Sequence, residues 1–146
     1  MKLGTLAIAA TLVGFLGQAA AAEEFEVRML NKGEKGSMVF EPDLVRAQVG
    51  DTVKFIPVDK GHDAQSIKGM IPDGAEMFAG KTNQEITVTL DVEGVYGVRC
   101  KPHYGLGMVM LIVAGEPVNL EAVEAVKTPK KAAKVFQELF DEIAAE

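Results

Sequence analysis

Residues 100–108 (CKPHYGLGM) bring together three side chains that bind soft transition metals. These are Cys100, His103 and Met108, and a further imidazole, His62, lies 38 residues before Cys100. Two imidazoles and a thiolate in one plane, with a weakly bound thioether on the axis, suit a copper ion that alternates between two oxidation states. The pattern therefore predicts a type 1 copper site, one per chain, that moves single electrons.

The same residues have a purely structural interpretation, because cysteine and methionine are common buried residues of β-rich cores. That interpretation is disfavoured here. The chain has one cysteine and two histidines, and all three fall into one pattern with a methionine at a fitting distance. No spacing fits a structural zinc site, which usually draws on paired cysteines or histidine pairs.

Two other copper functions remain as alternatives. A copper carrier would use exposed, exchangeable clusters of methionine or histidine, and neither Met70 nor Met77 has the spacing for one. A copper oxidase or nitrite reductase would need further histidines for a second, substrate-binding copper. Because the four predicted ligands leave no open position for a substrate, we expect an electron-transfer protein and not an enzyme.

The N-terminal residues predict a cleaved secretory signal peptide at 1–22. Lys2 precedes an apolar stretch at 6–16, a run of alanines follows at 19–22, and the charged residue Glu23 comes next. The apolar stretch is too short for a typical membrane span. We expect the mature chain to begin at Glu23 and to be a soluble periplasmic protein.

The mature chain, residues 23–146, has a length that suits a single domain with a substantial core. One cysteine in an oxidising compartment excludes an intramolecular disulfide, so the thiol must be buried or ligated. Lys2 is the one charged residue of 1–22, so the mature chain carries 14 basic and 21 acidic residues and a formal charge of −7. That charge argues against nucleic acid or an anionic membrane as the main partner, and we expect a monomer.

Short runs of apolar and β-branched residues, separated by turn signals, predict an all-β, antiparallel sandwich of the Greek-key type over 23–115. The segment 63–80 is less regular and is expected to be a long connection. The expected strands are 25–30, 39–40, 44–49, 52–58, 86–90, 95–100 and 108–113. The expected turns are at 31–33, 49–51, 72–74 and 93–94.

The composition changes after Gly115 and predicts a two-helix tail over 116–146. Asn119 is the expected cap of a helix over 120–126, and Thr128-Pro129 opens a second helix. An apolar stripe at helical spacing along the second helix should dock it on the sandwich. The stripe consists of Ala132, Phe136, Leu139, Phe140 and Ile143.

With ligands, strands and tail assembled, the chain resembles the cupredoxins, the type 1 blue copper proteins, and most closely those small members found in bacterial periplasms. The helical tail favours these over plastocyanins, which typically end at the last strand. The resemblance covers nearly all of residues 23–146. The stretches that carry it are 27–33, 38–42, 57–62, 70–74 and 100–104.

By position, the resemblance assigns copper to His62, Cys100, His103 and Met108. It also implies electron delivery to periplasmic redox proteins, such as copper or haem nitrite reductase and nitrous oxide reductase, or exchange with c-type cytochromes. Docking is expected at an apolar patch around His103, and a ring of basic residues would steer an acidic partner. The alternative is that these basic residues only solubilise the chain. The ring consists of Lys32, Lys60, Lys81, Arg99 and Lys101.

This chain departs from the resembled family at the residue that follows the first histidine. The family usually has asparagine there, which helps to tie the two ligand loops together, whereas this chain has Asp63. A carboxylate cannot donate as an amide does, so Asp63 is expected either to be protonated when buried or, when ionised, to lower the copper potential. Lys101 and Leu106 replace the family's frequent threonine and methionine and change the partner-facing surface. Met38 either approaches the His103 ring or packs in the core or rim.

Overall fold

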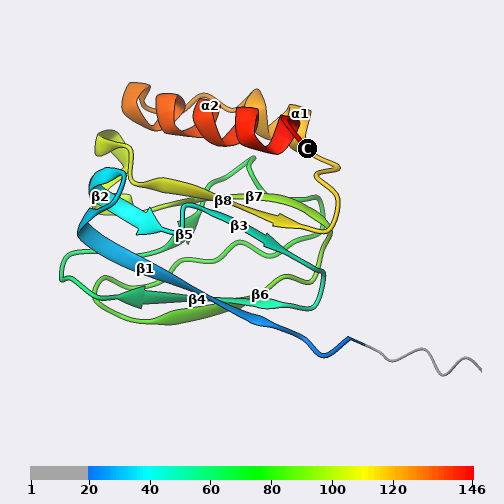
Figure 1. Ribbon diagram of the computed structural model, residues 1–146, viewed down its shortest axis with the longest axis horizontal. Coiled ribbons are helices and arrows are strands. Elements are labelled where there is room, and N and C mark those ends of the chain that lie inside the picture. Colours follow the sequence, from blue (N-terminus) through cyan, green and yellow to red (C-terminus); the bar gives the residue numbers. More distant parts are fainter. Residues whose placement is uncertain (1–19) are drawn as a thin grey trace, which may run out of the picture.

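The computed structural model describes residues 20–146, which form three layers seen edge-on in Figure 1. Two helices cover one four-stranded sheet, and that sheet packs on a second sheet of four strands. The predicted β-sandwich with a two-helix C-terminal extension is confirmed. The predicted signal peptide lies outside the described residues except for Ala20–Ala22. Within residues 20–146, no helix has the length and apolar character that crossing a membrane would require.

All seven predicted strands are present, and the structure adds one more. The first sheet has the order β2 (Gly36–Glu41), β1 (Glu24–Gly33), β4 (Thr52–Pro57), β6 (Ile86–Thr89). The second sheet has the order β3 (Leu44–Ala47), β8 (Val109–Ala114), β7 (Gly94–Arg99), β5 (Gln65–Ser66). The added strand, β5, lies in the predicted long connection and has two residues, too few for a periodic pattern.

The expectation of a purely antiparallel sandwich is wrong, because both sheets are mixed. β1 pairs with β4 in parallel and β3 pairs with β8 in parallel, whereas the other neighbours are antiparallel. The chain crosses from the first sheet to the second at β3 and returns at β4, so sequential strands are often not neighbours. The alternation of apolar and polar residues fixes which face of a strand is buried, not which strand lies beside it.

The predicted turn at 31–33 is also displaced. β1 continues to Gly33, and the chain turns at Glu34 and Lys35 before β2, with Gly33 paired to Gly36. Gly36 has a φ of 132°, which an L side chain rarely adopts, and so it favours the turn at this point. The displacement leaves Asn31 inside the strand, where its side chain contacts His62.

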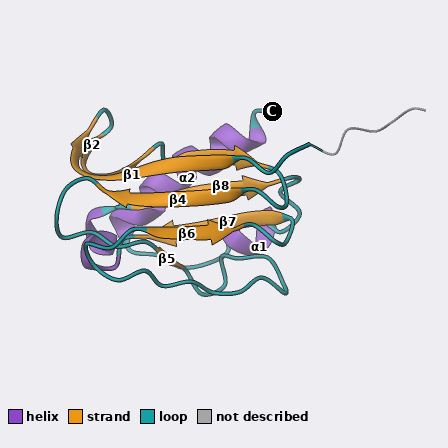
Figure 2. Cartoon of the chain, turned by 90° about the horizontal axis from the view of Figure 1, so that it is seen from below, coloured by secondary structure: helices purple, strands orange, loops and turns teal. Residues whose placement is uncertain are grey.

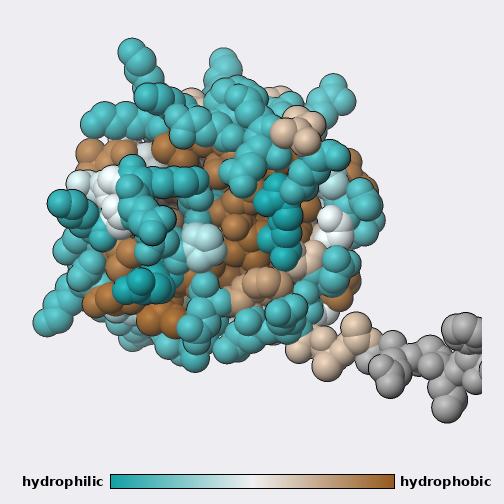
Figure 3. All heavy atoms as spheres, viewed as in Figure 1, coloured by the Kyte–Doolittle hydropathy of each residue, from teal (hydrophilic) through white to brown (hydrophobic). Residues whose placement is uncertain are grey.

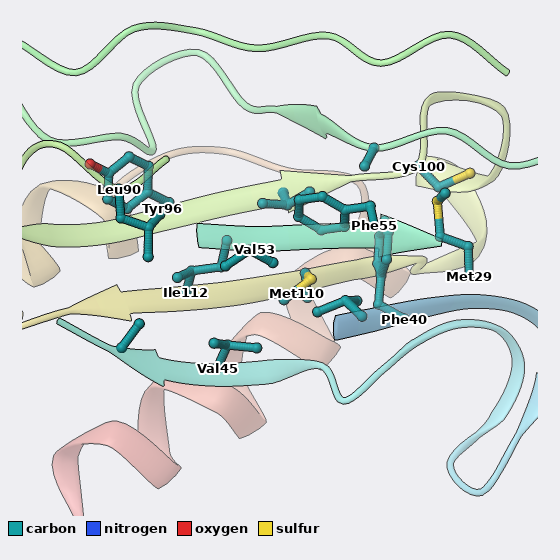
Figure 4. Packing of buried hydrophobic residues seen from close by; sticks show 14 of the residues in the cluster. Met29, Phe40, Val45, Val53, Phe55, Leu90, Tyr96, Cys100, Met110 and Ile112 are labelled. Carbon is teal, nitrogen blue, oxygen red and sulfur yellow. The ribbon is translucent and has the colours of Figure 1, made fainter. Parts of the chain in front are cut away.

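The sandwich core lies between the two sheets (Figure 4). In β4, Val53 and Phe55 are fully buried and Lys54 is not, as the alternation predicts. Cys100 and Met29 lie at one end of this cluster, and Leu90 and Tyr96 lie at the other (Figure 4). In the edge view of Figure 3, hydrophobic atoms are visible between hydrophilic side chains along the middle of the molecule.

The tail forms α1 (Leu120–Glu124) and α2 (Lys130–Ala144), which lie behind the strands in Figure 2. All five residues of the predicted stripe are buried and share a second apolar cluster with residues of β7 and β8. Asn119 is the N-cap residue of α1, as predicted, but its side chain makes no capping hydrogen bond. Asn119 instead accepts a hydrogen bond from the Val95 N–H and donates one to the Val95 carbonyl, which fixes the tail to β7.

Candidate metal centre

The predicted ligands come from three segments at one end of the sandwich. His62 lies in the loop after β4, Cys100 directly follows β7, and Met108 directly precedes β8. His103 lies between the last two in a short 3-10 helix, η1 (Lys101–Leu106). β7 and β8 are antiparallel neighbours, and the Cys100 N–H donates to the Met108 carbonyl at 3.0 Å, so the pairing fixes both ends of the loop.

Inside this loop the backbone is closed by local hydrogen bonds. The His103 N–H donates to the Cys100 carbonyl, and the Met108 N–H donates to the His103 carbonyl, each at 3.2 Å. Gly107 ends η1 with a φ of 90°, and a side chain there would meet the backbone carbonyl of Lys131, at the start of α2, at 3.2 Å. The loop therefore lies directly against the first turn of the tail helix, as Figure 1 shows.

Three ligand atoms converge. The Cys100 Sγ lies 3.7 Å from Nδ1 of His62 and 3.5 Å from Nδ1 of His103, and the two Nδ1 atoms are 3.1 Å apart. A first-row metal ion with bonds of about 2.0–2.3 Å to nitrogen and sulfur holds its ligand atoms about 3–4 Å apart. The residues therefore fit a metal ion. Among the described residues this is the one cluster of three or more such side chains placed to hold one.

The site is shielded from water on most sides. His62, Cys100 and Met108 are all fully buried. Burial, and to a lesser degree repulsion from the His103 imidazole, lower the pKa of His62, and burial raises the pKa of the Cys100 thiol. In the metal-free protein these effects favour a neutral His62, which has a free lone pair for a metal, and a protonated Cys100 thiol, whose proton a metal would displace.

Asn31 orients the first histidine, a role the sequence alone did not reveal. Its side-chain oxygen lies 2.8 Å from Nε2 of His62. Because an amide oxygen only accepts, His62 must carry its proton on Nε2 and present the lone pair of Nδ1 toward Cys100 and His103. The only signal in the sequence was the place of Asn31 in the first stretch that carries the resemblance.

Asp63 ties the two ligand loops together although it is not an amide. It is buried, and its Oδ1 accepts the N–H of Lys101 at 2.7 Å. Its Oδ2 accepts from the side chain of Gln65 at 3.3 Å. Both oxygens act as acceptors, the pattern that suits an ionised carboxylate. The link needs a donor only on the Lys101 side, so aspartate can replace asparagine here.

His103 is the ligand nearest to solvent. It is only partly buried, and Leu106 nearby has 52% of its surface exposed. Met38 is partly buried and packs against the sandwich core, and its approach to the His103 ring stays a prediction. The four predicted lysines of the basic ring are exposed, whereas Arg99 is partly buried.

Comparisons with known proteins agree with this geometry. The family model of copper binding proteins, plastocyanin/azurin family, matches residues 27–115. The chain is 48% identical to a pseudoazurin of Paracoccus pantotrophus over 129 residues, which are 88% of this chain and 89% of that protein. It is 49% identical to a pseudoazurin of Methylorubrum extorquens, with 94% of this chain and 90% of that protein covered.

Solved structures give the same result. The crystal structure of pseudoazurin from Methylobacterium extorquens AM1 superposes with a TM-score of 0.80 at 49% identity, covering 82% of this chain and 98% of that chain. Pseudoazurin from Hyphomicrobium denitrificans superposes with a TM-score of 0.78 at 39% identity, covering 82% and 97%.

Proposed function

The chain belongs to the pseudoazurins, within the plastocyanin/azurin family of copper-binding proteins, and from this premise we propose that it delivers single electrons to reductases in the bacterial periplasm. Pseudoazurins are blue copper electron carriers and not enzymes, and copper is their cofactor. For this chain we propose the identity of the copper ligands, the cellular compartment and the redox partners.

We assign the copper ligands to His62, Cys100, His103 and Met108. The observation that carries this assignment is the convergence of the Cys100 Sγ and the two Nδ1 atoms within 4.8 Å of one another. Met108 is joined by backbone hydrogen bonds to Cys100 and His103, and its thioether would be the weak axial ligand. When bound, copper supplies a one-electron couple, and the chain contributes ligand side chains that are already close together and largely shielded from water.

The visible spectrum tests this assignment. We expect residues 23–146, given one equivalent of copper(II), to show an intense blue thiolate band that a mild reductant bleaches reversibly. Cys100→Ser should abolish the band, because a hydroxyl does not replace the thiolate bond. Met77→Leu is the matched control, since Met77 is exposed and lies outside the site. A colourless wild-type product would exclude Cys100 as a copper ligand.

The proposed partners are periplasmic redox proteins, in particular nitrite reductase or nitrous oxide reductase. Support comes from the partly exposed His103, the exposed Leu106 beside it and the exposed lysines. An apolar contact surface with positive charges around it would steer an acidic partner and make association salt-dependent. The list of basic residues is Lys32, Lys60, Lys81, Arg99 and Lys101.

Charge reversal tests the docking surface. Lys32→Glu combined with Lys60→Glu should lower the second-order rate of electron transfer to a copper nitrite reductase by about tenfold at low salt and flatten its salt dependence. Lys127→Glu combined with Lys134→Glu, at two exposed positions outside the basic ring, is the control for net charge. If the Lys32→Glu/Lys60→Glu variant had the same rate and the same salt dependence as the wild type, steering by Lys32 and Lys60 would be excluded.

The periplasmic location follows from the predicted signal peptide at residues 1–22. When the full chain is expressed in a Gram-negative host, the protein recovered from the periplasm should begin at Glu23. Recovery of a chain that still begins at Met1, in the cytoplasmic or membrane fraction, would contradict the location.

A further inference from the structure

Arg99 differs from the four lysines with which the sequence groups it. Its side chain is partly buried, and its guanidinium carbon lies 5.1 Å from the centre of the Tyr104 ring. Its Nε is buried and has no hydrogen-bond partner among the described residues. A cation placed over an aromatic face is attracted by the quadrupole of the ring, whose face is electron-rich, and this partly offsets the missing hydrogen bond.

The other end of the guanidinium contacts the strand next to β7. Gln65 of β5 pairs with Arg99 in the sheet register, and the Arg99 Nη2 donates to the Gln65 Oε1 at 3.5 Å. The Gln65 amide donates in turn to Asp63, which also accepts the N–H of Lys101. Arg99 therefore lies between the Tyr104 ring and the Gln65–Asp63 pair.

Three residues in this chain of contacts, Asp63, Arg99 and Tyr104, are each next to a predicted copper ligand. Asp63 follows His62, Arg99 precedes Cys100, and Tyr104 follows His103. We propose that Arg99 is a positioning residue of the metal centre, whose guanidinium joins the segments that carry His62, Cys100 and His103. This inference rests on the proposed copper site.

The Tyr104 ring is well placed to transmit this effect. Besides Arg99, it packs against the apolar cluster formed by α2 and β8. The ring is thus fixed between the tail and the guanidinium, and the backbone of His103 is fixed with it.

An arginine meets these requirements and a lysine does not. The planar guanidinium stacks on a ring and donates sideways at the same time, whereas an ammonium group is a compact, strongly hydrated charge. Arg99→Lys therefore separates two roles. It keeps the positive charge that steering requires and removes the planar group that positioning requires.

The experiment compares Arg99→Lys with the wild type in two measurements. The first is hydrogen exchange of the His103 and Gly107 amides in the metal-free protein, and the second is the rate of copper release from the loaded protein. We expect both to be about three- to tenfold faster in Arg99→Lys, as for loss of a partly desolvated cation–π contact. Lys134→Gln, which removes an exposed positive charge outside the basic ring, should leave both unchanged.

Tyr104 provides a second, independent pair of variants. Tyr104→Phe retains the ring and should stay within about twofold of the wild type, whereas Tyr104→Leu should match Arg99→Lys. The double variant Arg99→Lys/Tyr104→Leu should exchange no faster than the faster single variant, because both remove the same contact.

Wild-type behaviour of Arg99→Lys in both measurements, or additive effects in the double variant, would overturn the positioning role. The exchange measurement needs no copper. If the wild type gave no blue band, the proposed function would fail while the contact between Arg99 and Tyr104 would still be tested.

Discussion

The side-chain oxygen of Asn31 lies 2.8 Å from Nε2 of His62, although the two residues are 31 positions apart in the chain. Asn31 belongs to β1 and His62 to the loop after β4, and β1 and β4 are parallel neighbours. The sheet that supports the core thus also delivers the group that selects the tautomer of the first ligand. The metal centre is therefore oriented before any metal binds.

Removing this contact should weaken copper binding without changing the ligands. Asn31→Leu leaves Nε2 of His62 without its acceptor, and we expect the copper dissociation constant to rise by about 10- to 100-fold. A competition titration with a chelator measures it. Lys32→Gln, at the next position and exposed, is the matched control. An unchanged constant in Asn31→Leu would show that packing alone orients the ring.

Copper binding should become tighter as the pH rises. Burial raises the pKa of the Cys100 thiol above its usual 9.0, so the metal-free thiol is protonated at neutral pH. Binding then releases this proton, and the apparent affinity should increase about tenfold per pH unit between pH 7 and 8. Titrations at several pH values measure the slope. A flat profile would mean that the thiolate already exists in the metal-free protein.

Acid should destabilise the metal-free protein through His62. Burial and the neighbouring His103 imidazole lower the pKa of His62 below its usual 6.5. Between the lowered value and 6.5 the unfolded chain binds a proton that the folded chain does not, so stability is complete above pH 6.5 and is lost as the pH falls through the folded pKa. Denaturant unfolding between pH 7 and 5 measures this loss.

The control for this measurement is His62→Gln, which lacks the titrating group. Its free energy of unfolding should fall less steeply over the same pH range. Equal slopes for the two metal-free proteins would assign the acid sensitivity to other residues.

Asp63→Asn should raise the reduction potential. The two oxygens of Asp63 both accept hydrogen bonds, and a negative charge beside the ligand loops stabilises copper(II) more than copper(I). Asparagine keeps an acceptor for the Lys101 N–H and removes the charge. Voltammetry of the two proteins measures the difference in reduction potential. A shift of about 59 mV corresponds to a tenfold change in the affinity for copper(II) relative to copper(I). Equal potentials would contradict an ionised Asp63.

The four ligands could be proposed from the sequence because cysteine and histidine are rare in this chain. One cysteine and two histidines left few combinations. The contacts of Asn31 with His62 and of Gln65 with Arg99 could not be predicted, because each joins segments that are distant in the sequence. Which strands become neighbours depends on where the chain changes sheets, and that information is not local.

The segment 31–33 and Asn119 depart from their local signals for a related reason. The sequence at 31–33 is a good turn signal, yet pairing with β2 extends β1 through it. Asn119 is a good cap residue, yet both ends of its amide bond the backbone of Val95. In each case a tertiary contact uses the residue differently from its local preference.

The packing of α2 on the sandwich should contribute strongly to stability. Leu139 is almost fully buried in the cluster that joins the helix to β8, so Leu139→Ala removes several buried carbon atoms and leaves a cavity. We expect the free energy of unfolding to fall by about 2–5 kcal/mol, measured with denaturant at neutral pH. Lys134→Ala, exposed on the same helix, should change it by less than about 0.5 kcal/mol. A decrease in the free energy of unfolding of less than about 1 kcal/mol would mean that the helix is only loosely docked. Since Tyr104 packs in the same cluster, Leu139→Ala should also loosen the ligand loop.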